Sequence, residues 1–243
     1  MKGEIYTGTQ ALCKIITQEE YERFINALNS VVRKSDYWRL VMHFGRYIGL
    51  RRDETATFNL KYLDLATGIY RLPKQKNKDK FEPVVVPNFL IPLIKEHILK
   101  YKVSIEASGG YLFFTRTNKH QSGWMIDQIV KKTRQRANLD TSYSKRKDNE
   151  AALHVLTYHT LRHLCLTDVQ DKLNDIYSTM LIGRHKSIIS ALRYQHTSIE
   201  QKKKITERVY SGEFQKQQEE IALLKESIKE IKDLLKSSII QKF

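Results

Sequence analysis

The sequence predicts an α+β fold that is mainly α-helical, with one small antiparallel β-hairpin sheet and a C-terminal helix of the coiled-coil type. Three observations carry this prediction. Apolar residues recur at helical spacing through most of residues 17–199, the stretch 68–87 favours strands, and residues 200–243 repeat apolar residues at heptad spacing. We therefore expect a lead-in over residues 1–16, one folded domain over residues 17–199 and a helical tail over residues 200–243.

Two helices are expected ahead of the strands. Thr17 and Glu20 form a capping box, and apolar residues follow them at helical spacing. Ser35 is a suitable cap for a second helix, whose apolar face leads directly to Gly49. The residues just after Gly49 are therefore expected at the end of a buried helix, which is a rigid place for a functional side chain.

The predicted hairpin has the strands IYRLP and EPVVVP on either side of a long basic turn. The lysines of that turn are Lys74, Lys76, Lys78 and Lys80. Such a turn is expected to project its ammonium groups beyond the sheet, where they can reach a bound polyanion.

Three further elements and one loop are expected between residues 88 and 152. Asn88 opens a helix that tolerates Pro92 in its first turn, residues 111–114 form a short buried strand, and Ser122 begins another helix. That helix ends in a basic stripe, and residues 139–152 are predicted to be a mobile basic loop. The basic residues of the stripe and the loop are Lys131, Lys132, Arg134, Arg136, Lys145, Arg146 and Lys147. The stripe is either a surface that contacts phosphate or an ordinary solvated helix face.

The tail repeats apolar residues at a and d positions through about three heptads, with Glu and Lys beside them. These residues are Phe214, Ile221, Leu224, Ile228, Ile231 and Leu235. A helix with such a narrow apolar seam needs a partner surface. The partner is either the body of the same chain or a second protomer, and the sequence leaves both possibilities open.

The formal net charge of +15 lies mainly on the body of the protein. From Glu200 onward ten Lys and Arg stand against eight Asp and Glu, so the tail carries +2 and residues 1–199 carry +13. A body this basic is expected to bind a polyanion, although charge alone fits a ribosomal or RNA-binding protein equally well.

Other features of the composition restrict the compartment. No apolar run approaches the roughly 18 residues that a membrane span needs, and no signal-peptide pattern is apparent. Cys13 and Cys165 are far apart and lack the spacing of metal ligands, which favours a reducing, cytosolic setting.

Residues 156–196 concentrate reactive side chains. His159 and Arg162 are three residues apart in the run HTLRH, so a helix would place both on one face, with His163 beside them. After the break at Gly183, His185 stands nine positions before Tyr194. Each of these residues has an ordinary structural explanation when it is taken singly, but together they indicate a site for phosphoryl transfer.

The rest of the pattern lies upstream. Residues 49–54 read Gly-Leu-Arg-Arg-Asp-Glu, and the basic hairpin follows them. The sequence resembles the tyrosine recombinases, which include phage-type integrases and Xer-like resolvases. The resemblance lies in the order of five motifs: the GLRRDE turn, the hairpin, HTLRH, the Gly-x-His turn and the tyrosine. The resemblance runs from about Thr17 to His196. It implies the DNA breaking-rejoining catalytic fold for residues 17–199.

The resemblance also implies roles for the motif residues. Tyr194 would attack a DNA phosphodiester and form a covalent phosphotyrosyl intermediate. Arg51, Arg162 and His185 would hold the non-bridging oxygens, and His159 would exchange the proton of the tyrosine.

A lysine of the hairpin would protonate the leaving 5′ oxygen. Lys76 matches the family's pattern best, whereas Lys74 lies closer to the usual strand position. Glu54 either orients an arginine or is an exposed acid in the first turn of the next helix. Arg52 is an alternative to Arg51 for the phosphate-binding role, but the position within the motif favours Arg51.

The expected partners are double-stranded DNA and further copies of the chain, from dimer to tetramer on DNA. The sequence shows no carboxylate pair or metal-ligand cluster, so no cofactor or metal is expected and a divalent-ion nuclease is disfavoured. Two alternatives stay open: a tyrosine-type topoisomerase, and a non-catalytic DNA-binding regulator of a mobile element. The expected location is cytoplasmic. In a prokaryote the protein would be associated with the nucleoid, and a viral or plasmid protein would lie in the host cell.

Two features depart from the family's pattern. Members usually carry a separate helical DNA-binding domain before the catalytic one, whereas about 16 residues precede the first helix here. A minimal form, a fragment and a form that relies on a partner all remain open. Arg184 stands where the family commonly has Gly before His, with Gly183 one position earlier, so a rearranged turn is expected there.

Overall fold

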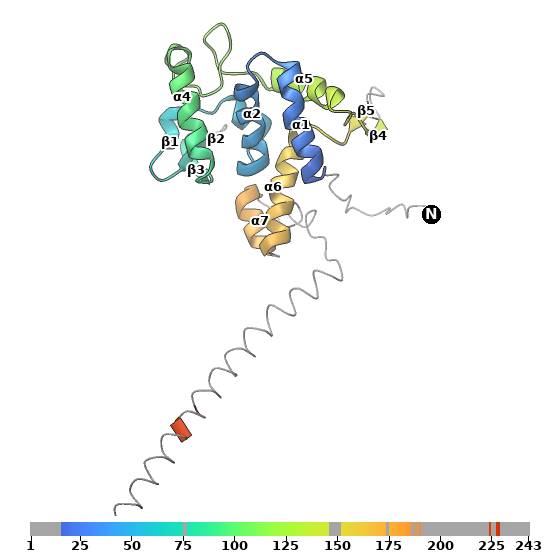
Figure 1. The fold of residues 1–243 in the computed structure, drawn as a ribbon. Coiled ribbons are helices and arrows are strands. Elements are labelled where there is room, and N and C mark those ends of the chain that lie inside the picture. The colour runs from blue at the N-terminus through green and yellow to red at the C-terminus, as the bar shows by residue number, and fades with distance from the viewer. Residues whose placement is uncertain are drawn as a thin grey trace, which may run out of the picture. The chain divides into compact units, whose positions relative to one another are not determined.

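The computed structural model describes residues 16–74, 77–145, 152–173 and 175–185, with the single positions 188, 190, 224, 227 and 228. The prediction of a mainly helical fold with a small antiparallel hairpin sheet is confirmed, and the described residues contain a second, two-stranded sheet that was not predicted (Figure 1). The elements in chain order are α1 (Gln18–Val31), α2 (Ser35–His43), the π-helical turn η1 (Phe44–Ile48), α3 (Arg52–Ala56), the 3-10 turn η2 (Leu60–Tyr62), β1 (Leu63–Asp64), β2 (Ile69–Lys74), β3 (Asn77–Val85), α4 (Leu90–Ala107), α5 (Gly123–Arg136), β4 (Ser142–Lys145), β5 (Ala152–His154), α6 (Tyr158–Leu173) and α7 (Ile176–Gly183).

The chain divides into two compact units, residues 1–195 and residues 196–243. All the elements named above belong to the first unit. In the second, the positions 224, 227 and 228 are helical. The heptad tail otherwise lies outside the described residues, as does the lead-in up to residue 15.

The cap and the apolar spacing together explain α1. The Glu20 N–H donates to Thr17 Oγ1 at 3.1 Å, and the Thr17 N–H donates to Glu20 Oε2 at 2.8 Å, which completes the capping box. The apolar residues of the helix are buried: Tyr21, Phe24, Ile25 and Leu28. The start of α2 differs slightly from the prediction, because Lys34 occupies the cap position and Ser35 is the first helical residue.

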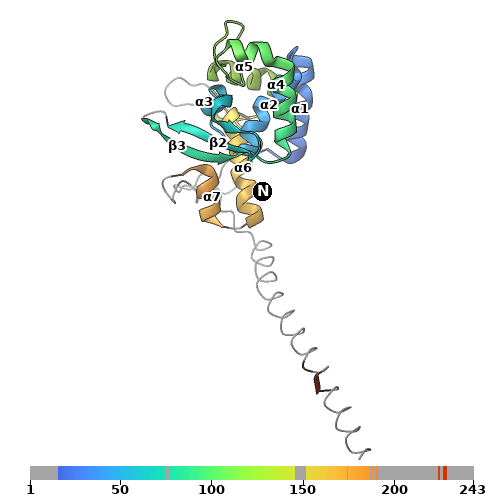
Figure 2. The same cartoon turned by 90° about the vertical axis from the view of Figure 1, so that its left-hand side faces the viewer.

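The three-stranded sheet has the order β1-β2-β3, and all its pairs are antiparallel (Figure 2). Its strands run further than predicted. Lys74 is paired with Asn77, so most of the basic cluster lies in strands instead of in a long turn. Backbone pairing of this kind needs no apolar side chain, which is why the apolar pattern stopped short of the strand ends.

Two segments after the sheet differ from the sequence prediction. Tyr111 and Phe114 make only isolated bridges, to Asn59 and His120, although residues 112–114 are buried as expected. The predicted loop 139–152 contains the strand β4 and the first residue of β5, and β4 and β5 pair with each other. Ser122 does cap α5, since its Oγ accepts the Met125 N–H at 3.1 Å.

The helix α6 is buried along most of its length and packs on η1, α5 and α7 (Figure 1). At its start, the Tyr158 hydroxyl donates to the Val41 carbonyl at 3.2 Å and lies 2.7 Å from the Thr55 hydroxyl. These two bonds hold α6 against both α2 and α3. The HTLRH run is therefore placed beside the turn that follows Gly49.

Candidate active site

Gly49 makes the first of two turns that build the site. Its φ of +68° lies in the left-handed region, and a Cβ there would lie 3.3 Å from the Sγ of Cys165. A side chain at this position would be both strained and crowded. Burial raises the pKa of the Cys165 thiol to about 11, so this group acts as an apolar neighbour of the turn. The turn delivers Arg51 to the cap position of α3, with 48% of its side chain exposed.

The end of α7 makes the second turn. The Arg184 N–H donates to the Leu181 carbonyl at 3.2 Å, and the His185 N–H donates to the Met180 carbonyl at 3.0 Å. This is a Schellman motif, in which a left-handed residue ends the helix. Arg184 is that residue, with φ +50° and ψ +46°. An L-residue in this conformation costs roughly 1–2 kcal/mol, and glycine is usual there.

Arg162 joins the two turns from within α6. Its side chain is among the largest that are fully buried, with 1% of the residue exposed. Nη1 donates to the carbonyl of Gly49 and Nη2 donates to the carbonyl of Gly183. Both carbonyls stand at helix ends, where the helix itself supplies no donor. One guanidinium therefore satisfies two helix ends and holds them at a fixed separation.

Glu54 is a second link between the same two turns. Its Oε1 accepts from Arg51 Nη1 at 2.7 Å, and its Oε2 accepts from the Arg51 backbone N–H at 2.7 Å. Oε2 also accepts from Arg184 Nη2 at 2.5 Å. Only 11% of the Glu54 side chain is exposed. Of the two interpretations of Glu54 that the sequence allows, the contacts with Arg51 and Arg184 fit a carboxylate that orients an arginine.

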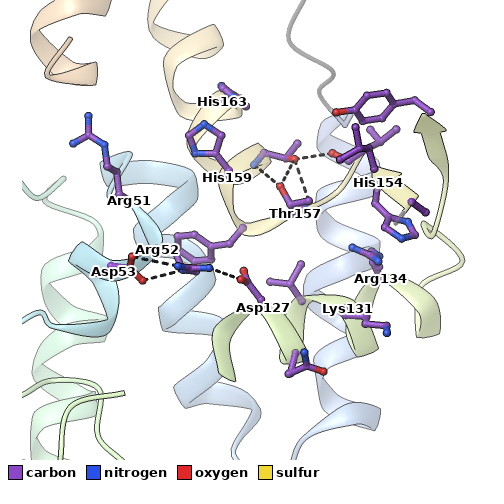
Figure 3. Close-up of a pocket in the computed structure, with 18 residues that line it drawn as sticks. Arg51, Arg52, Asp53, Asp127, Lys131, Arg134, His154, Thr157, His159 and His163 are labelled. Carbon is purple, nitrogen blue, oxygen red and sulfur yellow. Dashed lines mark hydrogen bonds and ion pairs between the residues drawn. The ribbon is translucent and has the colours of Figure 1, made fainter. Parts of the chain in front are cut away.

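Arg52 differs sharply from its neighbour Arg51. Its guanidinium binds Asp53 at 2.9 Å and Asp127 at 2.5 Å. Hydrogen bonds to Asp53 and to Asp127 raise the pKa of Arg52 above its usual range. Figure 3 shows Arg52 held between these two carboxylates while Arg51 points away from them. Arg52 therefore ties α3 to α5, and Arg51 presents its charge to solvent.

The start of α6 contributes two histidines to the site. His159 is exposed and His163 is half-buried, and their ring centroids are 4.3 Å apart. Thr157 caps this end of the helix, because its Oγ1 accepts the Thr160 N–H at 3.3 Å. His159 is therefore exposed at the start of the same helix that buries Arg162 almost one turn later. The two were predicted to share one face, but the pocket that His159 lines does not include Arg162.

His185 is packed against the residue before the second turn. A Cβ at Gly183 would lie 3.0–3.2 Å from three atoms of the His185 ring, which is closer than side chains normally approach. Gly183 thus leaves the space that the imidazole occupies. The same glycine supplies the carbonyl that Arg162 binds. Position 183 therefore both makes room for His185 and holds Arg162.

A pocket of about 780 Å³ lies between α3, α5, α6 and the β4–β5 pair (Figure 3). Its lining includes Arg51, Lys131, His154, His159 and His163. Arg51 and Lys131 bring positive charge to the pocket, and its carboxylates Asp53 and Asp127 are bound by Arg52. The pocket is therefore suited to an anionic ligand.

The basic stripe of α5 divides into two parts. Lys131, Lys132 and Arg136 are exposed, as a surface that contacts phosphate requires. Arg134 is buried, and this prediction needs correction: its Nε donates to Asp140 at 2.5 Å and its Nη1 donates to the Leu156 carbonyl at 3.1 Å. The helix turns this position inward, so the guanidinium stabilises the approach to α6 instead of facing solvent.

Several predicted residues lie beyond what the structure describes. Tyr194, Lys76, Arg146 and Lys147 are outside the described residues. The backbones of four other lysines are described as parts of strands, and their side chains are not: Lys74, Lys78, Lys80 and Lys145. Of the residues predicted to act on the phosphate, Arg51 and His159 line the pocket. Arg162 and His185 lie at the two turns instead, Arg162 bound to the carbonyls of Gly49 and Gly183 and His185 packed beside Gly183.

Sequence reasoning missed the partners that orient these groups. Asp127 and Asp140 each bind an arginine of the pocket region, and neither belongs to a motif. Arg184 had one signal, its departure from glycine before His185. Within the described residues, no set of three or more His, Cys, Asp or Glu could hold a metal ion. None of the helices described is long and apolar enough to cross a membrane.

The fold is shared with DNA recombinases and transposon integrases of known structure. XerA recombinase is 19% identical with a TM-score of 0.61, over 81% of this chain and 65% of that one. XerH recombinase bound to its difH substrate is 19% identical with a TM-score of 0.61, over 84% of this chain and 57% of that one. The Tn1549 transposon integrase in complex with transposon right end DNA is 16% identical with a TM-score of 0.61, over 84% of this chain and 68% of that one. This chain thus spans less than two thirds of the XerA and XerH chains.

A search of curated protein sequences found no match. The model of the phage integrase family matches residues 14–201, which is more than half of the sequence. The chain belongs to the phage integrase family, which confirms the resemblance drawn from the motifs.

Proposed function

We propose that the chain is a site-specific DNA recombinase or integrase, which cleaves and rejoins DNA through a covalent 3′-phosphotyrosyl intermediate without a metal ion. The observation that carries the proposal is the union of two distant turns by Arg162 and Glu54, beside the exposed Arg51 and His159. XerH and the Tn1549 integrase were solved with DNA, and we propose double-stranded DNA as the substrate here as well.

In this mechanism, the guanidinium of Arg51 binds a non-bridging oxygen of the scissile phosphate. It is half-exposed at a helix start and held by Glu54, so its charge is oriented before the substrate arrives. His185 and Arg162 complete the group that holds the phosphate. Because Arg162 is buried against two carbonyls, its contact with the phosphate requires the turn after α7 to shift when DNA binds.

Tyr194 attacks the phosphorus in this proposal, and the 5′ oxygen of the next nucleotide leaves. His159 accepts the tyrosine proton, and the hairpin lysine gives a proton to the leaving oxygen. The bond between the phosphate and the 5′ oxygen is exchanged for a phosphotyrosyl ester, so rejoining needs no external energy source. The rejoining step runs the same transfers in reverse with a new 5′ hydroxyl.

Incubation with nicked suicide duplexes tests the proposal. Such a duplex releases a short fragment on cleavage, so the covalent intermediate accumulates. We expect a protein–DNA adduct that survives denaturation and disappears on protease treatment. Binding without an adduct would favour the regulator, and relaxation of supercoiled DNA without strand exchange would favour the topoisomerase.

The identity of the general acid is open to a chemical test. A substrate with sulfur in place of the 5′ bridging oxygen needs no proton on its leaving group, because a thiolate leaves readily. We expect Lys76→Ala to slow cleavage of normal DNA by about 10²–10⁴-fold, the usual worth of general acid catalysis, and to cleave the sulfur substrate nearly as fast as the unmodified protein. The matched control is Lys74→Ala at the end of β2. If the sulfur substrate restores cleavage only by the Lys74→Ala variant, Lys74 is the general acid and Lys76 is not.

The tail is proposed to join protomers on DNA. Burial of an apolar side chain contributes about 1.5–3 kcal/mol, so its seam is expected to find a partner surface. Deletion of residues 213–243 should leave a protein that cleaves DNA but assembles and recombines poorly. A full-length variant with Leu224→Asp and Ile228→Asp should behave in the same way. Sedimentation with and without DNA measures the assembly, and unchanged oligomers together with a loss of thermal stability would show that the seam packs on its own body.

A further inference from the structure

Arg184 occupies a backbone position that disfavours it. The left-handed end of a helix is where glycine is normally found, because a Cβ there is strained. Here an arginine takes that conformation, and both hydrogen bonds of the Schellman motif are present. Strain that persists in a folded protein is offset by contacts elsewhere, and it is often found at functional sites.

The contact that offsets this strain is made by the Arg184 side chain. Its exposed fraction is only 3%, and Nη2 lies 2.5 Å from Oε2 of Glu54. The other carboxylate oxygen, Oε1, accepts from Arg51 Nη1. Oε2 also accepts from the Arg51 backbone N–H at 2.7 Å, and Arg184 adds a second, charged donor to the same oxygen. Together these two donors fix the rotation of the carboxylate that aligns Oε1 with Arg51. The orientation of Arg51 therefore depends on a residue 133 positions further along the chain.

Arg184 also alters the charge balance around Arg51. A glycine at position 184 would leave Arg51 as the guanidinium group that binds Glu54, and the charges of these two side chains cancel. Arg162, at the same two turns, would then be the remaining guanidinium beside them. With Arg184 present, one nearly buried carboxylate is shared by two guanidinium groups, so the cluster carries a net positive charge. The half-exposed Arg51 is the member that can present this charge to a ligand.

We infer that Arg184 is a positioning residue for strand cleavage, which acts through Glu54 to orient Arg51 and which adds positive charge beside it. The inference rests on the proposed function. It assigns a purpose to the arginine that stands where the family commonly has glycine.

Kinetics of cleavage provide the first test. Arg184→Gly relieves the left-handed strain, and we expect single-turnover cleavage of a suicide duplex to fall about tenfold with DNA affinity unchanged. Arg184→Lys restores a cation beside Glu54 and should recover most of that loss. In a Glu54→Gln background, Arg184→Gly should change the rate less than about twofold, because its effect passes through the carboxylate. An Arg184→Gly variant as fast as the unmodified protein, a Lys variant no better than Gly, or an equal loss in the Glu54→Gln background would each overturn the inference.

A measurement without DNA separates this inference from the proposed function. The Nε–Hε resonance of Arg51 can be assigned by its absence in Arg51→Lys. We expect it to shift in Arg184→Gly and to return toward its original position in Arg184→Lys. A shift in a protein that forms no adduct would support the positioning link and reject the recombinase proposal. An Arg51 resonance that Arg184→Gly leaves in place would reject the link, whether or not the protein cleaves DNA.

Discussion

Tyr194→Phe removes the covalent protein–DNA adduct and leaves DNA affinity nearly unchanged; this is the largest effect that we expect. The substitution deletes one hydroxyl group, which is the attacking atom in the proposed reaction and contributes little to binding. Adduct formation should fall on the order of 10³-fold or more, as expected when a nucleophile is removed. Denaturing gels of reactions with a suicide duplex measure the adduct, and a mobility shift on the same duplex measures affinity.

Tyr177→Phe is the matched control for this experiment. Tyr177 is 71% exposed and lies near the start of α7, so it stands about 10 Å along the helix from the turn at Arg184. Its loss should leave the adduct unchanged. Persistence of the adduct in Tyr194→Phe would instead make Tyr177 or Tyr210 the nucleophile.

Arg162→Ala should lower stability and abolish cleavage together. The substitution leaves the carbonyls of Gly49 and Gly183 without their buried donor. Two unpaired buried carbonyls at about 1–3 kcal/mol each predict a loss of about 2–6 kcal/mol in the free energy of unfolding. Urea unfolding measures this loss, and the suicide-duplex reaction measures cleavage.

Arg51→Ala is the comparison that separates positioning from contact with substrate. The Arg51 side chain is half-exposed, and its pair with Glu54 contributes roughly 0–1 kcal/mol. We therefore expect stability close to that of the unmodified protein, with cleavage reduced by about 10²–10³-fold through the loss of one charge-stabilising group. If Arg162→Ala unfolds at the same urea concentration as Arg51→Ala, Arg162 does not link the two turns.

The sequence was a good guide where local signals act within a few residues. The Thr17 capping box and the Ser122 cap predicted the starts of α1 and α5, because cap hydrogen bonds span only three residues. It was a poor guide to β4 and β5, where basic and polar residues concealed a pair that backbone hydrogen bonds hold. The segment 111–114 was predicted from its apolar run alone, and a buried run is not in itself a paired strand.

The same division applies to the site. Motif spacing placed Arg51, His159, Arg162 and His185 in one group. In the structure, Arg51 and His159 line one pocket, while Arg162 and His185 lie at the turns after Gly49 and Gly183. Spacing could not show that Arg134 turns inward, since a charged residue on an amphipathic helix reads as exposed. Nor could it show the bond between Arg184 and Glu54, which are 130 residues apart and meet only after α6 has packed.

The position of the phosphotyrosyl bond tests the central claim most directly. The adduct can be prepared in the presence of EDTA, digested with protease and nuclease, and sequenced by tandem mass spectrometry. The proposed mechanism predicts a nucleotide remnant joined through its 3′ phosphate to Tyr194, in a yield that EDTA does not reduce. A remnant on another tyrosine, a bond to the 5′ phosphate, or an adduct that forms only with a divalent ion would contradict it.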